Sequence, residues 1–479
     1  MKESYAAIIL AAGKGTRMKS RLCKVLHPVA GRPMVLYVLD AVSSAKIDRK
    51  VVVVGHQAEA VREVLGEATV DIVVQEPQLG TGHAVLTARN ALSHFWGHVL
   101  IVCGDTPLIR AETLHEFKAF HEAKGSLLTV MTATVPDPRG YGRVVRGATG
   151  CVSRIVEDRD ASPAEKAIQE INTGVYLVER ELLFRLLEGI VPNNSQGEYY
   201  LTDIIGAATT EGIPVHGFPV SSYEEVAGIN TRKELAQASA LMWNAIRERL
   251  MDAGVTLLDP SSVFIDAQVA IGPDTVIHPG VTISGRTEIG EGCVIETGVY
   301  IMNSKLGNRV KIFQGSRLDR AVVQDDTSIG PMAHLRPETF IGKRARIGNF
   351  VEVKKTVFGD GSKAAHLTYL GDSLIGKDVN IGCGTITCNY DGKRKHQTII
   401  HDRCFVGSDV QFVAPVEIGA DSLIGAGSTI TRDVPPGTLA VARSKQRMYR
   451  SRPKKGCPSN GVPIQATAGE DGRREKDES

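Results

Sequence analysis

A glycine-rich segment near the N-terminus, Leu10–Met18 with the sequence LAAGKGTRM, contains residue types that can bind a phosphate group. The backbone N–H groups of such a turn can surround phosphate oxygens, and Arg17 and Lys24 add positive charge. The segment is not a Walker A loop, because no Gly-Lys-Ser/Thr closes it. Met18 also stands where a dinucleotide-binding fingerprint needs its third glycine. Taken alone, the segment is interpreted equally well as a tight strand-to-helix turn that needs glycine for a positive φ.

A second set of residues that could do chemistry lies in Lys363–Asp372, with the sequence KAAHLTYLGD. A general base needs a pKa near the working pH, and an anionic substrate needs positive charge nearby. Imidazole titrates near neutral pH and suits the role of base. His366 is therefore the candidate base, and Lys354 and Lys355 supply positive charge nearby. A lone histidine in a loop is otherwise more often an ordinary surface residue.

Short apolar runs alternate with helical patterns through the first half of the chain. The predicted strands are Ala6–Ala12, Val51–Val54, Val70–Gln75 and Val99–Cys103. Three helices are predicted between them: one that begins at Pro33, and two at Glu59–Leu65 and His83–Leu92. This alternation predicts a parallel sheet covered by helices on both faces. Ligands of such sheets bind beyond the carboxyl ends of the strands, so the loops after Ala12, Gln75 and Cys103 are the places to expect chemistry. A long helix, Thr231–Ala253, then follows, capped by Asn230 or Thr231.

Aliphatic residues recur every sixth position through the second half of the chain. The runs are Ile265, Ile271, Ile277, Ile283, Ile289, Ile295 and Ile301; Leu306, Ile312 and Leu318; Val323, Ile329, Leu335, Ile341, Ile347 and Val353; and Ile400, Val406, Phe412, Ile418, Ile424 and Ile430. A period of six predicts a hexapeptide parallel β-helix of about nine coils and ~40 Å, in which each six residues form one wall. Lys354–Ser373 and Thr387–Thr398 interrupt the period and are predicted to be loops on a binding face.

Composition narrows the class of protein further. The 479 residues include 49 glycines and only 5% aromatics, which suits a narrow prism with a turn at every corner. A net charge of +2 gives no electrostatic signature for nucleic acid or an anionic membrane. The eight cysteines include no CxxC pair, and Cys383 and Cys388 lack zinc-ligand spacing despite nearby histidines. We therefore expect reduced thiols in a cytoplasmic protein, with no membrane span.

The ordered set of motifs in the first half resembles sugar-1-phosphate nucleotidyltransferases. Besides Leu10–Met18 and Lys24, it comprises Gln75 with Leu79–Gly82, Gly104-Asp105, Gly140–Arg143, Ile155–Glu157, Glu170–Gly174 and Gly228–Asn230. Joined to a hexapeptide domain, the chain from about residue 5 to 448 closely resembles the bifunctional bacterial N-acetylglucosamine-1-phosphate uridylyltransferase/glucosamine-1-phosphate N-acetyltransferase family. This resemblance implies an enzyme that makes UDP-N-acetylglucosamine for cell-wall synthesis, with Mg²⁺ as cofactor, acetyl-CoA and UTP as co-substrates, and a homotrimeric assembly.

The resemblance also implies a domain organisation. Residues 1–230 would form a Rossmann-like nucleotidyltransferase domain, 231–254 a linker helix, and 255–451 a left-handed parallel β-helix with N-acetyltransferase activity. The tail, residues 452–479, mixes basic and acidic residues with Pro, Gly and Ser and is expected to be disordered.

The family pattern assigns residues of the first half to UTP and UDP-N-acetylglucosamine. The matching positions are Leu10, Ala11, Ala12, Gly13, Lys24, Gln75, Gly80, Thr81, Cys103, Gly104, Asp105, Gly142, Glu157, Asn172 and Asn230. Among them, Leu10–Gly13, Gln75, Gly80 and Thr81 would hold uracil and ribose, and Gly142, Glu157 and Asn172 the N-acetylglucosamine moiety. Asp105 and Asn230 would bind Mg²⁺, while Arg17 and Lys24 would steady the pyrophosphate that leaves. Gly197–Asp203 also resembles the family, and we interpret it as structural.

The same pattern assigns residues of the second half, with His366 as the base. Arg336, Lys354, Tyr369 and Asn380 match glucosamine-phosphate contacts, and Cys383, Asn389, Tyr390, Ser408, Ala426 and Arg443 match acetyl-CoA contacts. Three cysteines depart from the family: Cys23 where Pro is usual, Cys103 where Tyr is common, and Cys383 where Ala is common. The backbone N–H of Cys383 could still serve as the oxyanion donor. Its thiol could be acylated by a neighbouring thioester, although a tolerated small residue is the simpler interpretation.

Two alternatives stay open at this stage. The chain could be a nucleotidyltransferase whose β-helix only oligomerises or regulates, or a scaffold whose prism merely assembles subunits. His366–Tyr369 and Asn389-Tyr390 argue against both, and an assay of free CoA release would separate the three.

Overall fold

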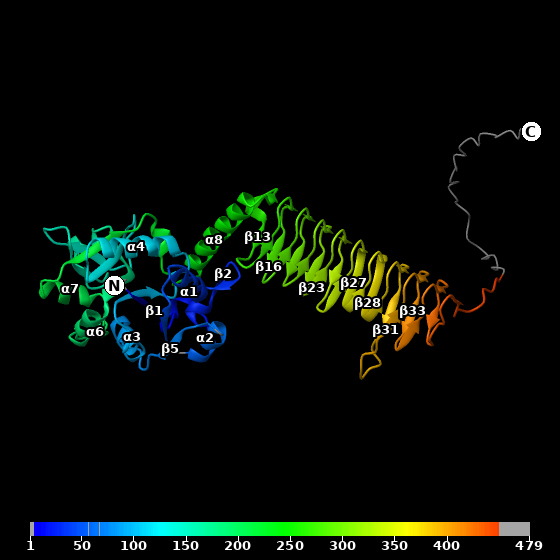
Figure 1. The fold of residues 1–479 in the computed structure, drawn as a ribbon, viewed down its shortest axis with the longest axis horizontal. Helices are drawn as coiled ribbons and strands as arrows, with labels where there is room; N and C mark the ends of the chain where they lie inside the picture. The colour runs from blue at the N-terminus through cyan, green and yellow to red at the C-terminus, as the bar shows by residue number, and fades with distance from the viewer. Residues whose placement is uncertain (1–3, 56, 67, 450–479) are drawn as a thin grey trace, which may run out of the picture.

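The computed structural model describes residues 4–449 except 56 and 67, so the tail predicted at 452–479 lies outside the described residues. Figure 1 shows a compact α/β body at the N-terminus, a single oblique helix, and a long column of stacked coils. The helices are α1 (Met34–Ser44), α2 (Ala58–Leu65), α3 (Thr81–Thr87), α4 (Ala111–Ala123), α5 (Pro163–Lys166), α6 (Arg180–Glu188), α7 (Asp203–Thr210) and α8 (Arg232–Asp252). The predicted Rossmann-like domain followed by a parallel β-helix is confirmed.

The N-terminal body is built on a sheet with the path β11-β7-β10-β6-β1-β4-β5. Its strands are β1 (Tyr5–Ala11), β4 (Arg49–Val54), β5 (Asp71–Val74), β6 (His98–Cys103), β7 (Leu128–Thr134), β10 (Glu170–Glu179) and β11 (Val215–Pro219), with β8 (Arg143–Arg146) and β9 (Val152–Val156) attached to β10. Successive residues of β1 point to opposite faces, and Ile8 and Ile9 are both fully buried in two different apolar clusters. Helices α3, α6 and α7 cover one face, and α1, α2 and α4 cover the other.

The four predicted strands, β6, β1, β4 and β5, are parallel to one another, as predicted. β10, which was not among the predicted strands, runs antiparallel to both β6 and β7. The reason is the connection, because β7 is followed by the antiparallel pair β8 and β9, which returns the chain to the sheet without a crossover helix. Gly142 and Asn172 come from this antiparallel part.

The C-terminal column is a parallel β-helix with three walls. The first wall stacks β12 (Thr256–Leu257), β15 (Val276–Ile277), β18 (Val294–Ile295), β21 (Lys311–Ile312), β24 (Ser328–Ile329), the starts of β27 (Arg346–Phe358) and β28 (Lys363–Ile375), β29 (Asn380–Ile381), β32 (Phe405–Val406), β35 (Leu423–Ile424) and β37 (Leu439–Ala440). The second wall stacks β13 (Phe264–Ile265), β16 (Thr282–Ser284), β19 (Tyr300–Met302), β22 (Arg317–Asp319), β25 (His334–Leu335), the middles of β27 and β28, β30 (Ile386–Cys388), β33 (Gln411–Val413) and β36 (Thr429–Ile430). The third wall stacks β14 (Ala270–Ile271), β17 (Glu288–Ile289), β20 (Lys305–Leu306), β23 (Ala321–Val323), β26 (Thr339–Ile341), the ends of β27 and β28, β31 (Thr398–Ile400) and β34 (Val416–Ile418).

The interior of this column confirms the six-residue pattern. Ile265, Ile283, Ile301, Leu318 and Leu335 follow one another on the second wall and are fully buried in a single continuous apolar cluster. Each coil therefore buries its aliphatic residues against the coils above and below, which is how a solenoid is stabilised.

One of the two predicted breaks in the repeat is wrong and the other is confirmed. Residues 354–373 do not form a projecting loop, because all but a short turn at 359–362 belong to β27 and β28, which pair in register from Arg346 with Lys363 to Phe358 with Ile375. The six-residue period slips because coils of 17 residues, such as that from Arg346 to Lys363, follow coils of 18, such as that from Ser328 to Arg346. The second break is a loop, residues 389–397, between β30 and β31, and it projects from the column beside β31 in Figure 1.

The linker helix joins the two bodies through specific contacts. Thr231 caps α8 in a capping box with Glu234, as the predicted N-cap requires, and Ile246 and Leu250 pack against the first coils. A short hairpin, β2 (Pro28–Val29) and β3 (Arg32–Pro33), also reaches the column. Gly31 in its turn has a φ of +77°, and a Cβ there would lie 2.1 Å from Asp266 Cγ, so this close approach requires glycine.

None of the helices within residues 4–449, setting aside 56 and 67, has the length and apolar character needed to cross a bilayer.

Candidate active sites

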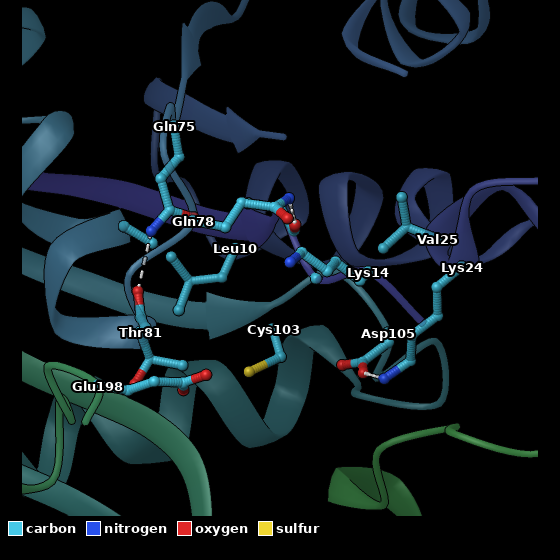
Figure 2. A pocket seen from close by; sticks show the side chains of 14 residues that line it. Leu10, Lys14, Lys24, Val25, Gln75, Gln78, Thr81, Cys103, Asp105 and Glu198 are labelled. Carbon is cyan, nitrogen blue, oxygen red and sulfur yellow. Dashed lines mark hydrogen bonds and ion pairs between the residues drawn. The ribbon is translucent and has the colours of Figure 1, made fainter. Parts of the chain in front are cut away.

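A cavity of about 340 Å³ opens beyond the carboxyl ends of β1 and β6, which lie side by side with Leu10 opposite Cys103. Its lining residues are Leu10, Ala12, Gly13, Lys14, Lys24, Val25, Gln75, Gln78, Gly80, Thr81, Ala84, Cys103, Asp105 and Glu198. Most of the predicted nucleotide-binding residues thus come together, and Figure 2 shows Gln75 at one end of the cavity and Lys24 with Asp105 at the other. Lys14, Val25, Gln78, Ala84 and Glu198 were not predicted to belong to it.

One cationic group connects the two predicted metal ligands. The Lys24 ammonium forms an ion pair with Asp105 and donates a hydrogen bond of 2.6 Å to Asn230 Oδ1. Arg17 Nη2 donates to the same Oδ1 at 2.8 Å, and the Asn230 amide is oriented by its own bond to the Gly228 carbonyl. Asp105 and Asn230 oxygens therefore converge on one positive charge, the arrangement that a cation would also need.

The donor set fits Mg²⁺, with one condition. A carboxylate and an amide oxygen are hard oxygen ligands, which Mg²⁺ prefers. Within the described part of the chain, no cluster of three or more His, Cys, Asp and Glu residues could hold a metal by itself. Asp105 and Asn230 would therefore have to share the ion with substrate phosphate oxygens, as nucleotide-binding magnesium sites commonly do.

The far end of the cavity is held by the loop that follows β5. Gln75 is buried, and its amide donates to the Gly80 carbonyl at 2.9 Å and contacts His83 Nδ1 at 3.1 Å. Thr81 Oγ1 accepts a bond of 3.0 Å from the Leu201 N–H. Residues 197–203 thus pack directly behind this loop, which agrees with their structural interpretation, although Glu198 from the same segment also lines the cavity.

Three predicted sugar contacts form one row beside the cavity. Asn172 N–H donates to the Gly142 carbonyl at 2.8 Å, and a Cβ on Gly142 would lie 3.4 Å from Glu157 Oε1. Burial raises the pKa of the Glu157 carboxyl, and a hydrogen bond of 3.3 Å from the Thr202 hydroxyl partly offsets this. A partly desolvated carboxylate of this kind gains from a hydroxyl or amide donor on a ligand.

The surroundings of Cys103 disfavour its thiolate form, and its reactivity tests the geometry of the cavity. Burial and then the neighbouring Asp105 carboxylate raise the pKa of its thiol to about 12. We expect iodoacetamide to alkylate Cys103 at pH 8 at least ~10-fold more slowly in the folded protein than in urea, because the thiolate is the reactive form. Peptide mass spectrometry of timed samples measures both rates, and equal rates would contradict this description of Cys103.

The predicted acetyl-transfer base lies on a strand of the β-helix. His366 is in β28, directly below Asn349 of β27, and its Nδ1 contacts Asn349 Oδ1 at 2.6 Å. Because an amide oxygen can only accept, Nδ1 donates this bond, which selects the tautomer of the neutral ring that has its lone pair on Nε2. Asn349 was missed in the sequence; the available signal was its position one 17-residue coil before His366.

Four predicted acetyl-CoA residues stack below His366 along the corner between the first and second walls, here called the His366 edge. Asp409 N–H donates to the Cys383 carbonyl at 2.6 Å, and Gly427 N–H donates to the Ser408 carbonyl at 2.8 Å. Arg443 Nη1 donates to the Ala426 carbonyl at 2.6 Å. Cys383, Ser408, Ala426 and Arg443 therefore occupy equivalent corners of successive coils.

Four more predicted residues lie at the opposite corner of the second wall, here called the Lys354 edge: Arg336, Lys354, Asn389 and Tyr390. Asp372 contacts two of these residues. Asn389 Nδ2 donates to Asp372 Oδ2 at 2.5 Å, and Lys354 Nζ lies 4.0 Å from the same oxygen. Tyr390 follows in the loop, and Arg336 pairs with Glu352 at 2.8 Å one coil earlier. Lys395, which was not predicted, reaches this edge from the loop, and the nearby Lys354 ammonium lowers its pKa.

A single prism does not unite the two edges. His366 and Asp372 are six residues apart on β28, which turns at Leu367 and Asp372, and an extended chain of this length spans at most about 20 Å at a rise of ~3.3 Å per residue. Tyr369 lies on the wall between them, and Asn380 lies on the first wall, opposite Lys363. The predicted acetyl-transfer residues thus divide into two half-sites.

The fold and the two sites define a two-domain transferase, with a nucleotidyltransferase body and a hexapeptide β-helix. The MobA-like NTP transferase domain family matches residues 7–173, and the bacterial transferase hexapeptide family (six repeats) matches 268–303 and 397–432. The chain is 54% identical over 445 residues to "Bifunctional protein GlmU" of Pelobacter propionicus, covering 93% of this chain and 97% of that one. It is 53% identical to the Geobacter sulfurreducens protein of the same name (93% and 97% covered) and 50% identical to that of Shouchella clausii (92% and 96%).

The chain belongs to the family of the bifunctional protein GlmU. The predicted family and the predicted function, a bifunctional uridylyltransferase and acetyltransferase of UDP-N-acetylglucosamine synthesis, are thereby confirmed. The alternatives of a non-catalytic β-helix and of a scaffold lose their support.

Proposed function

We propose that this chain acetylates glucosamine-1-phosphate at the β-helix and then transfers UMP from UTP to the product at the cavity of the N-terminal body. The observation that carries this proposal is the pairing of two separate centres in one chain: Lys24 between Asp105 and Asn230, and His366 oriented by Asn349.

Uridylyl transfer requires two anions to approach each other, so its catalysis is mainly positioning and charge neutralisation. Asp105 and Asn230 would hold Mg²⁺, which when bound neutralises phosphate charge. Lys24 and Arg17, freed from their present oxygen partners, would contact the pyrophosphate that leaves as the sugar phosphate attacks the α-phosphorus. Gln75 and Thr81 would hold uracil and ribose, and the row of Gly142, Glu157 and Asn172 would bind the sugar.

Acetyl transfer requires a neutral amine and a stabilised oxyanion. His366 Nε2 would take a proton from the amine of glucosamine-1-phosphate as its nitrogen attacks the thioester carbonyl. The C–S bond then breaks and the proton passes to the CoA thiolate, so that N-acetylglucosamine-1-phosphate and CoA leave. The Cys383 N–H would donate to the oxyanion, while Arg336, Lys354 and Tyr369 bind the phosphate of the acceptor.

A homotrimer would join the half-sites that one prism keeps apart. Phe340, Val357 and Leu374 follow one another on the third wall with 39%, 44% and 39% of their surfaces exposed, and Phe350 and Leu367 are exposed beside His366. Exposed apolar stripes of this kind mark interaction surfaces. Cyclic packing of three prisms would set the His366 edge of one copy against the Lys354 edge of the next.

Light scattering should therefore give about three times 51.5 kDa. Co-expression of His366→Ala and Lys354→Ala chains should restore acetyl transfer that neither variant shows alone, because a mixed trimer contains sites built from two unmutated edges. A monomeric mass with full acetyltransferase activity, or mixed trimers as inactive as either parent, would contradict the shared site.

We also propose that the protein works in the cytoplasm on small-molecule substrates, without nucleic acid or membrane partners. Support comes from the near-neutral charge of +2 and from the seven cysteines within residues 4–449, none of which is in a disulfide. A reducing compartment keeps such thiols free.

A further inference from the structure

Arg143 carries a buried charge that neither active site uses directly. Its side chain is only 1% exposed, although it is one of the largest in the protein. Its Nη2 donates to Asp158 Oδ1 at 2.8 Å, its Nη1 donates to the Tyr141 carbonyl, and its Nε has no partner. Because a buried ion pair is often no more stabilising than apolar residues of the same volume, stability alone does not explain this guanidinium.

The location of Arg143 in the sheet points to a role in sugar binding. Arg143 pairs with Ile171 of β10 on one side and with Val156 of β9 on the other. The adjoining row contains Gly142, Asn172 and Glu157, the three proposed sugar contacts. Within that row, Asn172 N–H donates to the Gly142 carbonyl at 2.8 Å, and Gly142 is the chain neighbour of Arg143.

The contacts of Arg143 brace this row from behind. Successive residues point to opposite faces of a strand, so the Arg143 side chain leaves the sheet on the face opposite to the sugar row. There it binds Tyr141, which precedes Gly142, and Asp158, which follows Glu157. One planar guanidinium thus connects the backbone on one side of the row to a side chain on the other, which a single ammonium could not do with the same geometry.

We propose that Arg143 is a positioning residue for the sugar-phosphate substrate of uridylyl transfer, which sets the separation of Gly142 and Glu157. This inference rests on the proposed binding of the sugar by Gly142, Glu157 and Asn172. Loss of the brace lets Gly142 and Glu157 drift apart. Misplacement by about 1 Å at a binding site can reduce an enzyme's efficiency by up to ~100-fold.

The test measures KM for N-acetylglucosamine-1-phosphate and for UTP separately in Arg143→Met and Arg143→Lys. We expect the KM for the sugar phosphate to rise at least ~10-fold in Arg143→Met and less in Arg143→Lys, while the KM for UTP stays within about twofold. Acetyl transfer should not change. Asp158→Asn weakens the same ion pair by changing Asp158, which is more exposed than Arg143. It should also raise the KM for the sugar phosphate. This variant provides the test if the Arg143 variants do not fold.

Arg146→Met is the matched control. Arg146 belongs to the same strand and binds Glu170 at 2.6 and 2.8 Å and the Gly150 carbonyl at 2.6 Å, away from the sugar row. Its loss should lower the thermal midpoint and leave the sugar KM unchanged. A folded Arg143→Met or Asp158→Asn enzyme with an unchanged sugar KM would overturn the positioning role. An unchanged sugar KM in Glu157→Gln would instead remove the proposed sugar row itself.

Discussion

The His366→Ala enzyme is expected to lose acetyl transfer to glucosamine-1-phosphate by about 10²–10⁴-fold, the usual contribution of a general base. Its uridylyl transfer to supplied N-acetylglucosamine-1-phosphate should stay near the original rate. The reason is geometric, because His366 lies in a late coil of the β-helix while Lys24, Asp105 and Asn230 lie in the N-terminal body. Release of free CoA and formation of UDP-N-acetylglucosamine measure the two reactions independently.

A suitable control is His401→Ala, which removes another exposed histidine of the β-helix. His401 contacts Glu417 at 2.6 Å next to the third wall, away from the two proposed edges, so its loss should leave both activities unchanged. The acetyl-transfer rate of Asn349→Ala should lie between those of His366→Ala and His401→Ala, because this substitution removes only the acceptor that orients His366. Equal acetyl transfer in His366→Ala and His401→Ala would remove His366 as the base.

Asp105→Asn should have the opposite effect, with uridylyl transfer reduced by roughly 10²–10³-fold, or several kcal/mol, and acetyl transfer retained. The substitution keeps the shape of the side chain and removes the carboxylate that forms the ion pair with Lys24. Initial rates at saturating Mg²⁺ give the effect.

Asp137→Asn is the control for this variant, because Asp137 pairs with Arg139 on the surface and does not line the cavity. It should leave uridylyl transfer unchanged. Undiminished formation of UDP-N-acetylglucosamine by Asp105→Asn would exclude Asp105 as a metal ligand.

Much of the architecture could be predicted from the sequence, because a strict six-residue period and fully buried strands leave clear apolar patterns. The six-residue recurrence predicted the β-helix, because only one inward aliphatic per wall fits a narrow prism, and Ile283 and Ile301 are indeed fully buried. The apolar run Ala6–Ala12 predicted β1 and its loop, because a strand buried on both faces must be apolar throughout.

The residues that were missed depend on contacts between coils or strands. Asn349 meets His366 only because their coil has 17 residues, and a slip of one residue in the repeat was interpreted as a loop. The antiparallel direction of β10 likewise depends on the β8–β9 return, and it brings Arg143 next to the sugar row. Local sequence patterns do not fix such registers.

The two-site account is tested most directly by mixing the purified His366→Ala and Asp105→Asn enzymes with glucosamine-1-phosphate, acetyl-CoA and UTP. Each variant alone should form almost no UDP-N-acetylglucosamine. In the mixture, the Asp105→Asn enzyme should release N-acetylglucosamine-1-phosphate, and the His366→Ala enzyme should convert it to UDP-N-acetylglucosamine. Once this intermediate has accumulated, the rate of product formation should approach that of the original enzyme. A mixture as inactive as its components, with the thermal unfolding of both variants unchanged, would show that one site serves both reactions and would contradict the account.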